Sequence, residues 1–404
     1  MSVQIPYLIH KENYTEMYIA LAEEVFQCDR ESGFIFTTPE YVLKGENKIK
    51  DVATQDCKSI AEALNIAKMQ LNQALNDGHK EAILMGGIPF QHVNDMQLML
   101  MDQSKIYQNV LYLHPDYKLP QLKGGDTRYV PSPEEFQQQV HAVIQDLKNT
   151  ALNKVVLARS LELNFAENID ISHLFYNLAK YNQHGYNYAV ATHVSKNGWF
   201  VGASPEQLIA KQGRKIRSRP VAGTIPRIDD PQQDQLMAQQ LLKSEKDHYE
   251  HALVIEMIGD ILSPLCSSLR IPKIPTLIST KRLWHLASFI EGELKQDMHV
   301  LDLLEKLHPT PAICGQPTSL AREKISTVER FNRELFAGTM GWANAQGDGE
   351  WSVTVRCARV QAATARLFAG AGIVSSSNPN AERLETAAKF RTVLDGFGLS
   401  ADQI

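Results

Sequence analysis

The chain alternates between short apolar runs and polar turn residues, a pattern that predicts many strands. The runs are rich in β-branched and aromatic residues and end at Gly, Asn, Pro or Ser, which is typical of strands joined by tight turns. The predicted strands are residues 33–36, 82–88, 154–163, 188–194, 199–203, 207–211, 215–219, 338–343, 351–360 and 366–369.

Several of these strands follow one another with only a short polar turn between them. The turns are residues 195–198, 212–214 and 346–349, and each contains Gly. Such turns make hairpins, and consecutive hairpins make antiparallel sheets. A regular alternation of strand and helix, which would indicate a parallel sheet, is not seen in the sequence.

A second pattern, with apolar residues three and four positions apart, predicts helices at residues 60–75, 133–148 and 231–262. The helix at 133–148 has Ser132 as its N-cap and Pro133 at its first position, both favoured there. The predicted fold class is therefore α+β, with large antiparallel sheets flanked by helices.

Residues 116–133 are rich in Pro and Gly and predict a linker. We expect a single large domain of residues 1–404, in which an N-terminal elaboration, 1–130, precedes a catalytic core, 131–400.

The composition excludes some classes of partner. The net charge is −5, whereas binding along a nucleic acid backbone needs an excess of positive charge. The five cysteines form no CxxC pair, no run of about 18 apolar residues predicts a membrane span, and the first residues lack a signal-peptide pattern. These features predict a cytoplasmic protein, and they allow a small anionic substrate in a locally basic pocket.

The C-terminal part combines three kinds of anion-binding or metal-binding group. Arg356 lies on a predicted strand, Gly370-Ala371-Gly372 offers small-residue N–H groups, and Glu382, Glu385 and Lys389 share one face of a predicted helix. Together they suit an anionic ligand held through a metal ion. Taken alone, such a helix face is more often simply solvated.

Lys154 and Glu206 are candidates for proton transfer. Lys154 begins an apolar strand, and lysines in apolar surroundings generally have a lowered pKa, which suits a general base. Glu206 follows a strand among small residues, where a carboxylic acid could protonate a leaving hydroxyl. Each residue considered by itself is more often exposed to solvent.

A turn and a polar helix face add weaker candidates. Gly223 and Thr224 could offer N–H and hydroxyl groups to a carboxylate, although an ordinary turn is the commoner role. Asp247 and Glu250 share a helix face, and their oxygen atoms favour Mg²⁺, since the zinc motif HExxH is absent. His285 is by default a core or sheet-edge histidine.

Nine phrases, in order along the chain, resemble the chorismate-binding enzymes, and among these the isochorismate synthases most. The phrases are KVVLAR, GASPEQL, PVAGT, SEKDHYEH, LWHL, HPTPAICGQP, SVTVRCARV, LFAGAGIV and the ExxETxxK of residues 382–389. The resemblance runs from about residue 132 to about residue 398, and the first third of the chain resembles the family more loosely, through SGFIFTTP and MGGIPF.

The resemblance implies a fold and a reaction. The fold is that of anthranilate synthase large subunits, with two stacked antiparallel sheets and helices outside them. The reaction converts chorismate to isochorismate, with water attacking C2 of the ring and the 4-hydroxyl leaving. Lys154 matches the general base that activates the water, and Glu206 matches the general acid that protonates the departing hydroxyl.

The same resemblance implies a role for each remaining candidate. Glu250 and Glu385 match the Mg²⁺ ligands. The positions that match contacts to the substrate carboxylates are Arg356, Gly370 and Lys389. Gly223 and Thr224 match contacts at the ring end. The positions that match supporting residues are Asp247, Glu382 and His285.

Two positions separate the branches of the family. Aminodeoxychorismate synthases have a nucleophilic lysine where this chain has Ala222, and ammonia-using anthranilate synthases have a glutamine where it has Lys154. Neither activity, nor an amidotransferase subunit as partner, is therefore expected, and a monomer is the family-based expectation.

The alternatives that stay open are a salicylate synthase, which also eliminates pyruvate, a menaquinone-pathway isochorismate synthase, and a chorismate-binding relative without catalysis. The phrases RCARV and SEKDHYEH favour the siderophore branch, which supplies 2,3-dihydroxybenzoate.

Overall fold

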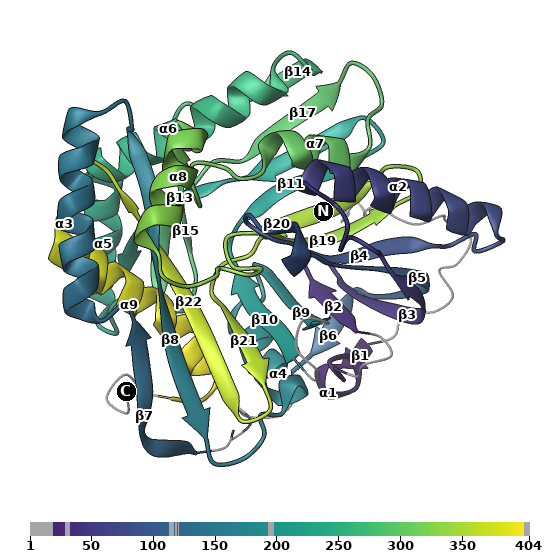
Figure 1. Ribbon diagram of the computed structural model, residues 1–404, viewed down its shortest axis with the longest axis horizontal. Helices are drawn as coiled ribbons and strands as arrows, with labels where there is room; N and C mark the ends of the chain where they lie inside the picture. The colour runs from purple at the N-terminus through teal and green to yellow at the C-terminus, as the bar shows by residue number, and fades with distance from the viewer. Residues whose placement is uncertain are drawn as a thin grey trace.

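Figure 1 shows the computed structural model, in which helices lie around the outside of extensive sheet. The structure describes residues 19–28, 33–112, 117, 119, 121–192 and 198–399. The helices are α1 (Ala22–Val25), α2 (Ile60–Asn76), α3 (Pro133–Asn149), α4 (Ile171–Tyr181), α5 (Pro231–Lys243), α6 (Glu245–Leu262), α7 (Val300–Leu307), α8 (Thr318–Val328) and α9 (Pro379–Gly396). No helix in these ranges is long and apolar enough to cross a membrane.

The longest strands are β3 and β5 in the first third of the chain, β8 near its middle and β22 near its end. They are β1 (Ile19–Leu21), β2 (Phe34–Thr37), β3 (Val42–Asp51), β4 (Ile83–Ile88), β5 (Gln97–Tyr107), β6 (Asn109–Leu111), β7 (Leu122–Val130), β8 (Lys154–Phe165), β9 (Tyr186–Thr192), β10 (Gly198–Ser204), β11 (Gln207–Gln212), β12 (Lys215–Arg219), β13 (Val221–Pro226), β14 (Cys266–Arg270), β15 (Thr276–Ser279), β16 (Leu283–Ala287), β17 (Ile290–Leu294), β18 (Gly315–Gln316), β19 (Thr339–Asn344), β20 (Gly349–Val353), β21 (Cys357–Gln361) and β22 (Thr364–Ile373).

Most strands belong to one continuous antiparallel sheet. The order of neighbours is β7-β8-β22-β21-β10-β9-β2-β3-β5-β4-β19-β20-β11-β12-β17-β14, and β18 pairs with the start of β8. A smaller antiparallel sheet contains β13, β16 and β15. The predicted α+β class, with large antiparallel sheets flanked by helices, is confirmed.

Strands from the first third of the chain lie inside this sheet. β2 pairs with β9, and β4 pairs with β19, so that Gly86 lies opposite Gly341. The two parts expected on either side of residue 130 therefore contribute strands to the same sheet. The division into an N-terminal elaboration and a catalytic core stays a prediction.

Local signals predicted several elements well. The helices expected at 60–75 and 133–148 are α2 and α3, and α3 begins with a capping box between Ser132 and Glu135. The first hairpin is confirmed by the pairing of β9 with β10, although residues 195–197 of its turn lie outside the described ranges.

The expected linker and the long expected helix were predicted wrongly. The segment expected as a linker contains β7, which pairs along the edge that β8 would otherwise leave open. The helix expected at 231–262 is two helices, because Ser244 has an extended backbone that ends α5, and its hydroxyl accepts a hydrogen bond from the Asp247 N–H at 3.2 Å, which caps α6.

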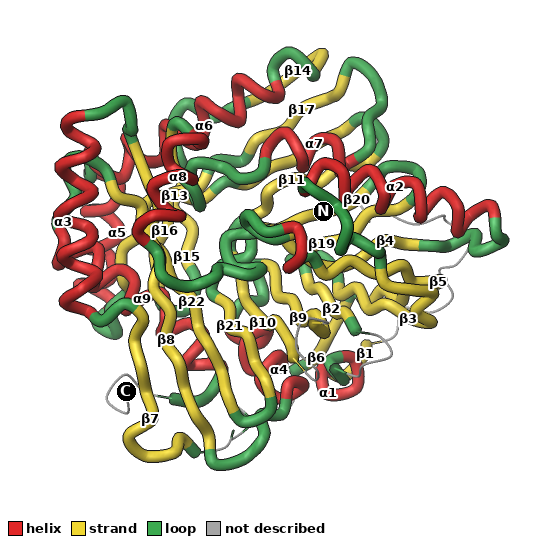
Figure 2. The backbone as a smooth tube through the Cα atoms, in the orientation of Figure 1, coloured by secondary structure: helices red, strands yellow, loops and turns green. Residues whose placement is uncertain are grey.

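A hydrophobic cluster fixes α9 against the sheet. Leu161 of β8 and Leu367 of β22 belong to this cluster together with Phe390 and Val393 of α9, and all four side chains are buried. Burial of each such side chain contributes roughly 1.5–3 kcal/mol. Figure 2 shows α9 and α3 beside β8 and β22, so this packing determines where the polar side of α9 meets the sheet.

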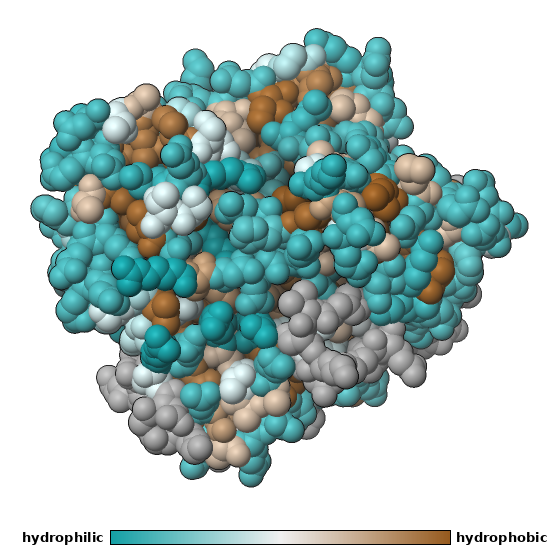
Figure 3. All heavy atoms as spheres, in the orientation of Figure 1, coloured by the Kyte–Doolittle hydropathy of each residue, from teal (hydrophilic) through white to brown (hydrophobic). Residues whose placement is uncertain are grey.

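The surface in Figure 3 is mostly hydrophilic, and its exposed hydrophobic residues form small separate groups. Ile274 and Met69 are the most exposed large hydrophobic residues among those described, and they come from a loop and from α2. Scattered exposure of this kind is normal for a globular protein.

Candidate active site

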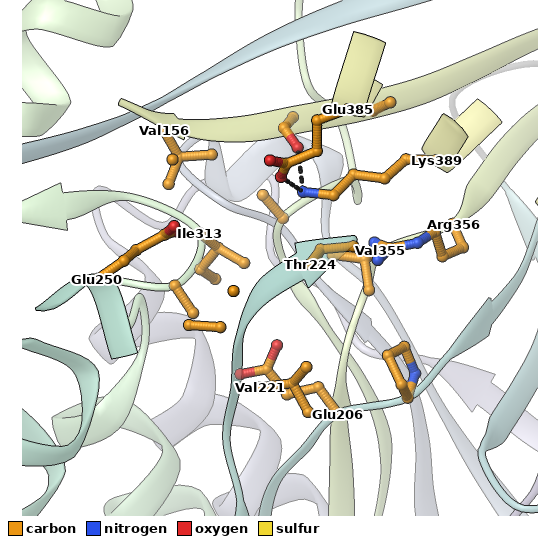
Figure 4. A pocket seen from close by; sticks show the side chains of 18 of the residues that line it. Val156, Glu206, Val221, Thr224, Glu250, Ile313, Val355, Arg356, Glu385 and Lys389 are labelled. Carbon is orange, nitrogen blue, oxygen red and sulfur yellow. Dashed lines mark hydrogen bonds and ion pairs between the residues drawn. The ribbon is translucent and has the colours of Figure 1, made fainter. Parts of the chain in front are cut away.

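A cavity of about 630 Å³, part of which is open to solvent, is lined by residues of the large sheet, of β13, and of helices α6 and α9. The predicted site residues that line it are Glu206, Glu250, Glu385, Arg356 and Lys389, together with Gly223, Thr224 and Gly370. In Figure 4 the side chains of Glu206, Glu250 and Glu385 reach into it from different sides. Segments distant in sequence therefore meet at one polar cavity.

Glu206 is the carboxyl group best suited to donate a proton. It lies between β10 and β11, where its N–H donates to the Ser204 hydroxyl at 3.2 Å, and only 4% of the residue is exposed. Burial raises its pKa to about 8, against the smaller lowering effects of the Val221 N–H and the Lys154 and Arg356 charges. Glu206 is therefore mostly protonated near pH 7, as a general acid must be.

Lys154 and Glu250 form an ion pair in the wall of the cavity. Lys154 begins β8 and is fully buried, and its Nζ lies 2.9 Å from Oε1 of Glu250 on α6. Glu250 lines the cavity and Lys154 does not, so the lysine lies next to the cavity, in contact with the carboxylate.

The charges around Glu250 keep it ionised. Burial raises its pKa, but the positive charges of Lys154, Lys246 and Lys389 together outweigh burial and leave the pKa below its ordinary value. A buried carboxylate that stays ionised is a potential ligand for a metal cation.

Gly372 makes room for this ion pair. A Cβ atom at this position would lie 2.0 Å from Glu250 Oε1 and 3.0 Å from Lys154 Cε. Any other residue would displace the carboxylate, so the glycine is required by the approach of these side chains. The sequence showed Gly372 within a glycine run, but nothing local indicated what it faces.

The run from Gly370 to Gly372 lies in a strand, and its role in binding an anion stays a prediction. These residues belong to β22 and pair with Ala158 to Val156 of β8, so the run is part of the sheet. Gly370 still lines the cavity, where its carbonyl oxygen accepts a hydrogen bond from Lys389 Nζ at 2.7 Å.

Helix α9 presents Glu385 and Lys389, but not Glu382, to the cavity. Lys389 Nζ lies 2.6 Å from Glu385 Oε1, and both residues line the cavity. Glu382 is 1% exposed and instead forms an ion pair with Lys246, whose Nζ lies 2.9 Å from Glu382 Oε1. Burial, supported by the charge of Glu385, raises the pKa of Glu382 to about 7. Their shared helix face in the sequence pattern therefore did not bring all three residues to the cavity.

Lys246 was missed by the sequence analysis. Burial lowers its pKa, but the surrounding carboxylates of Glu385, Glu250 and Glu382 raise it more, so the ammonium form is strongly favoured. Two sequence signals could have indicated it: Lys246 lies within the phrase SEKDHYEH, and it is four residues before Glu250 on α6.

Arg356 lies in a loop between β20 and β21, so its prediction on a strand is wrong. Its φ is +50°, in the left-handed region, which costs a residue other than Gly roughly 1–3 kcal/mol. Burial lowers the pKa of Arg356 to about 10, although Glu385 and Glu206 act to raise it. The guanidinium is therefore still charged at neutral pH, and it reaches the cavity from the side opposite Glu250 in Figure 4.

Gly223 lies in β13, at a register shift in the pairing with β16 rather than in a turn, and it approaches α6 closely. Its φ is +82°, and a Cβ here would lie 3.0 Å from the Cβ of Asp247, so both conformation and space favour Gly. Burial raises the pKa of Asp247, which is also bonded to the Ser244 hydroxyl. Asp247 supports the wall of the cavity but does not line it.

His285 lies behind the cavity wall and contacts Thr224. Its Nδ1 lies 3.0 Å from the Thr224 hydroxyl, and it pairs with Thr224 between β16 and β13. Burial lowers the pKa of His285 well below its usual value, and the Arg356 and Lys389 charges add to this effect. His285 is therefore neutral, and Thr224 is the residue of this pair that lines the cavity.

The carboxylates of the cavity fit a hard metal ion. Within the described ranges, no three or more His, Cys, Asp or Glu side chains form a ready-made metal site. Mg²⁺ does not need one, since it usually binds through one or two carboxylates, water and the substrate. Glu250 and Glu385 offer only oxygen donors, so their chemistry fits Mg²⁺ rather than zinc.

Comparison with known proteins reveals clear similarity over nearly the whole chain. The family described as chorismate binding enzyme matches residues 61–398. The Bacillus subtilis protein named isochorismate synthase DhbC is 37% identical over 388 residues, which cover 94% of this chain and 96% of that protein.

Solved structures are similar as well. One is the Bacillus anthracis DhbC, described as a 2,3-dihydroxybenzoate-specific isochorismate synthase, with a TM-score of 0.86 and 37% identity over 94% of this chain and all of that one. Anthranilate synthase component I of Streptococcus pneumoniae has a TM-score of 0.71 at 18% identity, covering 88% of this chain and 92% of that one, and this similarity shows the fold alone.

Proposed function

This chain belongs to the chorismate-binding enzyme family, and we propose that it is an isochorismate synthase. The observation that carries the proposal is the pairing of a protonated acid with a buried lysine beside a cavity rich in cations. Glu206 has a pKa of about 8, and Arg356 and Lys389 line the same cavity. A dianionic substrate that must lose a hydroxyl group needs this combination.

In the proposed reaction, water adds at C2 of the chorismate ring, the two ring double bonds shift, and the C4–O bond breaks. Lys154 accepts a proton from the attacking water, and Glu206 gives a proton to the departing 4-hydroxyl, which leaves as water. One proton is taken and one is given, so substrate and product are isomers. The acid must be protonated and the base unprotonated when the water is activated, so Lys154, which is paired with Glu250 as an ammonium in this structure, must first release its proton.

The substrate carboxylates are proposed to lie between the cations of the cavity. Arg356 suits two parallel hydrogen bonds to a carboxylate, and Lys389, next to the Gly370 carbonyl, supplies a second positive charge. Gly223 and Thr224 form the wall at the ring end. These roles rest on the position of each residue in the cavity and on the family resemblance.

Glu250 and Glu385 are proposed to hold Mg²⁺, which would neutralise a substrate carboxylate when it is bound. Both residues line the cavity, and each is in contact with a lysine in this structure. Glu382, Asp247 and His285 are proposed to support these residues from behind the cavity surface.

Two residues argue against the amine-using branches of the family. Ala222 lines the cavity where aminodeoxychorismate synthases carry a lysine, and a methyl group cannot attack the ring. Lys154 occupies the position at which ammonia-using members carry a glutamine. We therefore propose that water is the nucleophile and that no amidotransferase subunit is needed.

A route to 2,3-dihydroxybenzoate is the proposed context, because that product is in the description of the Bacillus anthracis relative. The cysteines of the described ranges are all free, which suits the reducing conditions of the cytoplasm. We propose a cytoplasmic monomer, as the family resemblance predicts.

The test is product analysis. Purified protein is incubated with chorismate and Mg²⁺, and the products are separated by chromatography. We expect isochorismate as the product. Salicylate with pyruvate would instead identify a salicylate synthase, and absence of any conversion would show a chorismate-binding protein without catalysis.

A further inference from the structure

The unusual backbone of Arg356 is held by hydrogen bonds on both sides of its Cα atom. The Tyr188 hydroxyl donates to the carbonyl oxygen of Val355 at 3.0 Å. The N–H of Ala203 donates to the carbonyl oxygen of Arg356, also at 3.0 Å. Both peptide groups that flank Arg356 are therefore anchored, one by a side chain and one by the β10 backbone.

The tyrosine is built into this position. Tyr188 lies on β9, is fully buried, and pairs with Gly202 of the neighbouring β10. A Cβ at residue 202 would lie 2.4 Å from the Tyr188 oxygen and 2.8 Å from Cys357 Cβ. A glycine on one strand thus opens the space that the hydroxyl on the next strand occupies.

The hydroxyl is a dependable donor. Burial raises the pKa of Tyr188 well above its ordinary value, so the proton stays on the oxygen at all pH values at which the protein would work. The hydroxyl itself does not line the cavity, whereas Val355 and Arg356 do. Tyr188 can therefore affect a ligand only through the loop that it contacts.

We propose that Tyr188 is a positioning residue for substrate binding, whose hydroxyl holds the Val355–Arg356 peptide so that the guanidinium is aimed into the cavity. The inference rests on the proposed function in one respect, that Arg356 binds a substrate carboxylate. Without the hydroxyl, the peptide before Arg356 is free to rotate, and the guanidinium leaves the geometry in which it can grip a carboxylate with two bonds.

The main test is Tyr188→Phe, with Tyr186→Phe as the matched control. Tyr186 lies on the same strand, is also buried, and donates to Glu350 at 3.0 Å, away from the cavity lining. Each change removes one buried hydroxyl and keeps the ring. We expect Tyr188→Phe to raise KM for chorismate about five- to tenfold with kcat within about twofold of the unchanged protein. Tyr186→Phe should lower the thermal stability by about as much as Tyr188→Phe does, because each loses one buried hydroxyl. It should leave KM for chorismate unchanged.

Two further variants separate positioning from general damage. Gly202→Ala keeps the hydroxyl but forces it to move, so it should raise KM in the same direction. In an Arg356→Lys background, Tyr188→Phe should add little further increase, because the residue through which it acts has already been changed. If the double variant raised KM by the full product of the two single-variant increases, the proposal would be overturned. An unchanged KM in folded Tyr188→Phe or Gly202→Ala protein would also overturn it.

Affinity for chorismate is also measured by calorimetry, on a Lys154→Ala background so that the ligand is not consumed. We expect the dissociation constant to rise with Tyr188→Phe as KM does. Equal affinities with and without the hydroxyl would refute the positioning role. Chorismate that binds to the unchanged protein but is never converted would refute the proposed function alone, and a failure to bind would refute both.

Discussion

Lys154 Nζ lies 2.9 Å from Glu250 Oε1, so the proposed base and a proposed metal ligand share one ion pair. The lysine comes from the start of β8 and the glutamate from α6, and Gly372 of β22 provides the space in which they meet. Any cation that binds Glu250 therefore competes with Lys154 for this carboxylate. The proton-transfer and metal-binding parts of the site are physically coupled.

Replacing Lys154 with Met should lower kcat at least about a hundredfold, the contribution typical of a positioned general base. Methionine has a similar length but cannot accept the proton. Initial rates of chorismate consumption measure the effect. Lys211→Met is the control, since Lys211 is equally buried but contacts Asp297 and Asp348, neither of which lines the cavity. It should lose stability and keep kcat, and a Lys154→Met protein of near-normal kcat would refute the assignment.

The pH dependence of kcat/KM should report Glu206. Because its pKa is about 8 and the protonated form is the active acid, kcat/KM should fall about tenfold per pH unit above pH 8. Glu206→Gln keeps the shape but cannot give up the proton, so it should lose activity at least about a hundredfold at every pH. A high-pH limb that persists unchanged in residual Glu206→Gln activity would mean that another group causes it.

Glu206 should also make stability depend on pH. Its folded pKa of about 8 lies above the ordinary value of 4.5, so the folded protein holds a proton that the unfolded chain releases. The stabilisation from this proton is complete below pH 4.5 and is lost as the pH rises through 8. Glu206→Gln removes this dependence. Urea unfolding should show that, between pH 5 and pH 9, the free energy of unfolding of Glu206→Gln rises by roughly 3–5 kcal/mol relative to that of the unchanged protein. If the free energies of unfolding of the two proteins changed equally with pH, the raised pKa would be contradicted.

Metal affinity should depend on Glu385. Chelation should abolish turnover, and added Mg²⁺ should restore it. Glu385→Gln should weaken Mg²⁺ binding at least about tenfold in calorimetry, since even outer-shell partners of a metal contribute that much. Glu350→Gln is the control, because Glu350 is buried but bonded to Tyr41, Tyr186 and Gln207 away from the cavity lining. Equal Mg²⁺ affinities in both variants would exclude Glu385 as a ligand.

Gly372→Ala should damage the site by steric contact alone. The new Cβ would lie 2.0 Å from Glu250 Oε1, so the carboxylate must move and the ion pair with Lys154 must break. We expect a loss of roughly 1–3 kcal/mol in stability and of at least about a hundredfold in kcat/KM. Gly259→Ala on α6, whose Cβ would meet only the end of Ile271 at 3.2 Å, should keep activity. Normal activity in Gly372→Ala would show that Glu250 can be displaced without consequence.

Elements that depend on local signals were predictable from the sequence. Helix α3 begins where Ser132 and Pro133 predict it. The strands on the two sides of the predicted turns pair as hairpins. The break at Ser244 was also encoded locally, by a Ser three residues before Asp247, but the long helical pattern concealed it. The identities of most candidate residues came from short phrases shared with a family.

Only the tertiary structure decided which candidates face one cavity. Glu382 and Glu385 are equivalent in the sequence pattern, and the packing of α9 against β22 turns one towards Lys246 and the other into the cavity. Arg356 leaves its strand because partners on β9 and β10, distant in sequence, hold its flanking carbonyl groups.

The contributions of Gly372 and Tyr188 had no local signal at all, since each is defined by an atom on another strand or helix. Periodicity and turn residues act over a few positions and so determined the elements of this protein. The site depends on distances between segments that the sheet brings together, and those distances exist only once the sheet has formed.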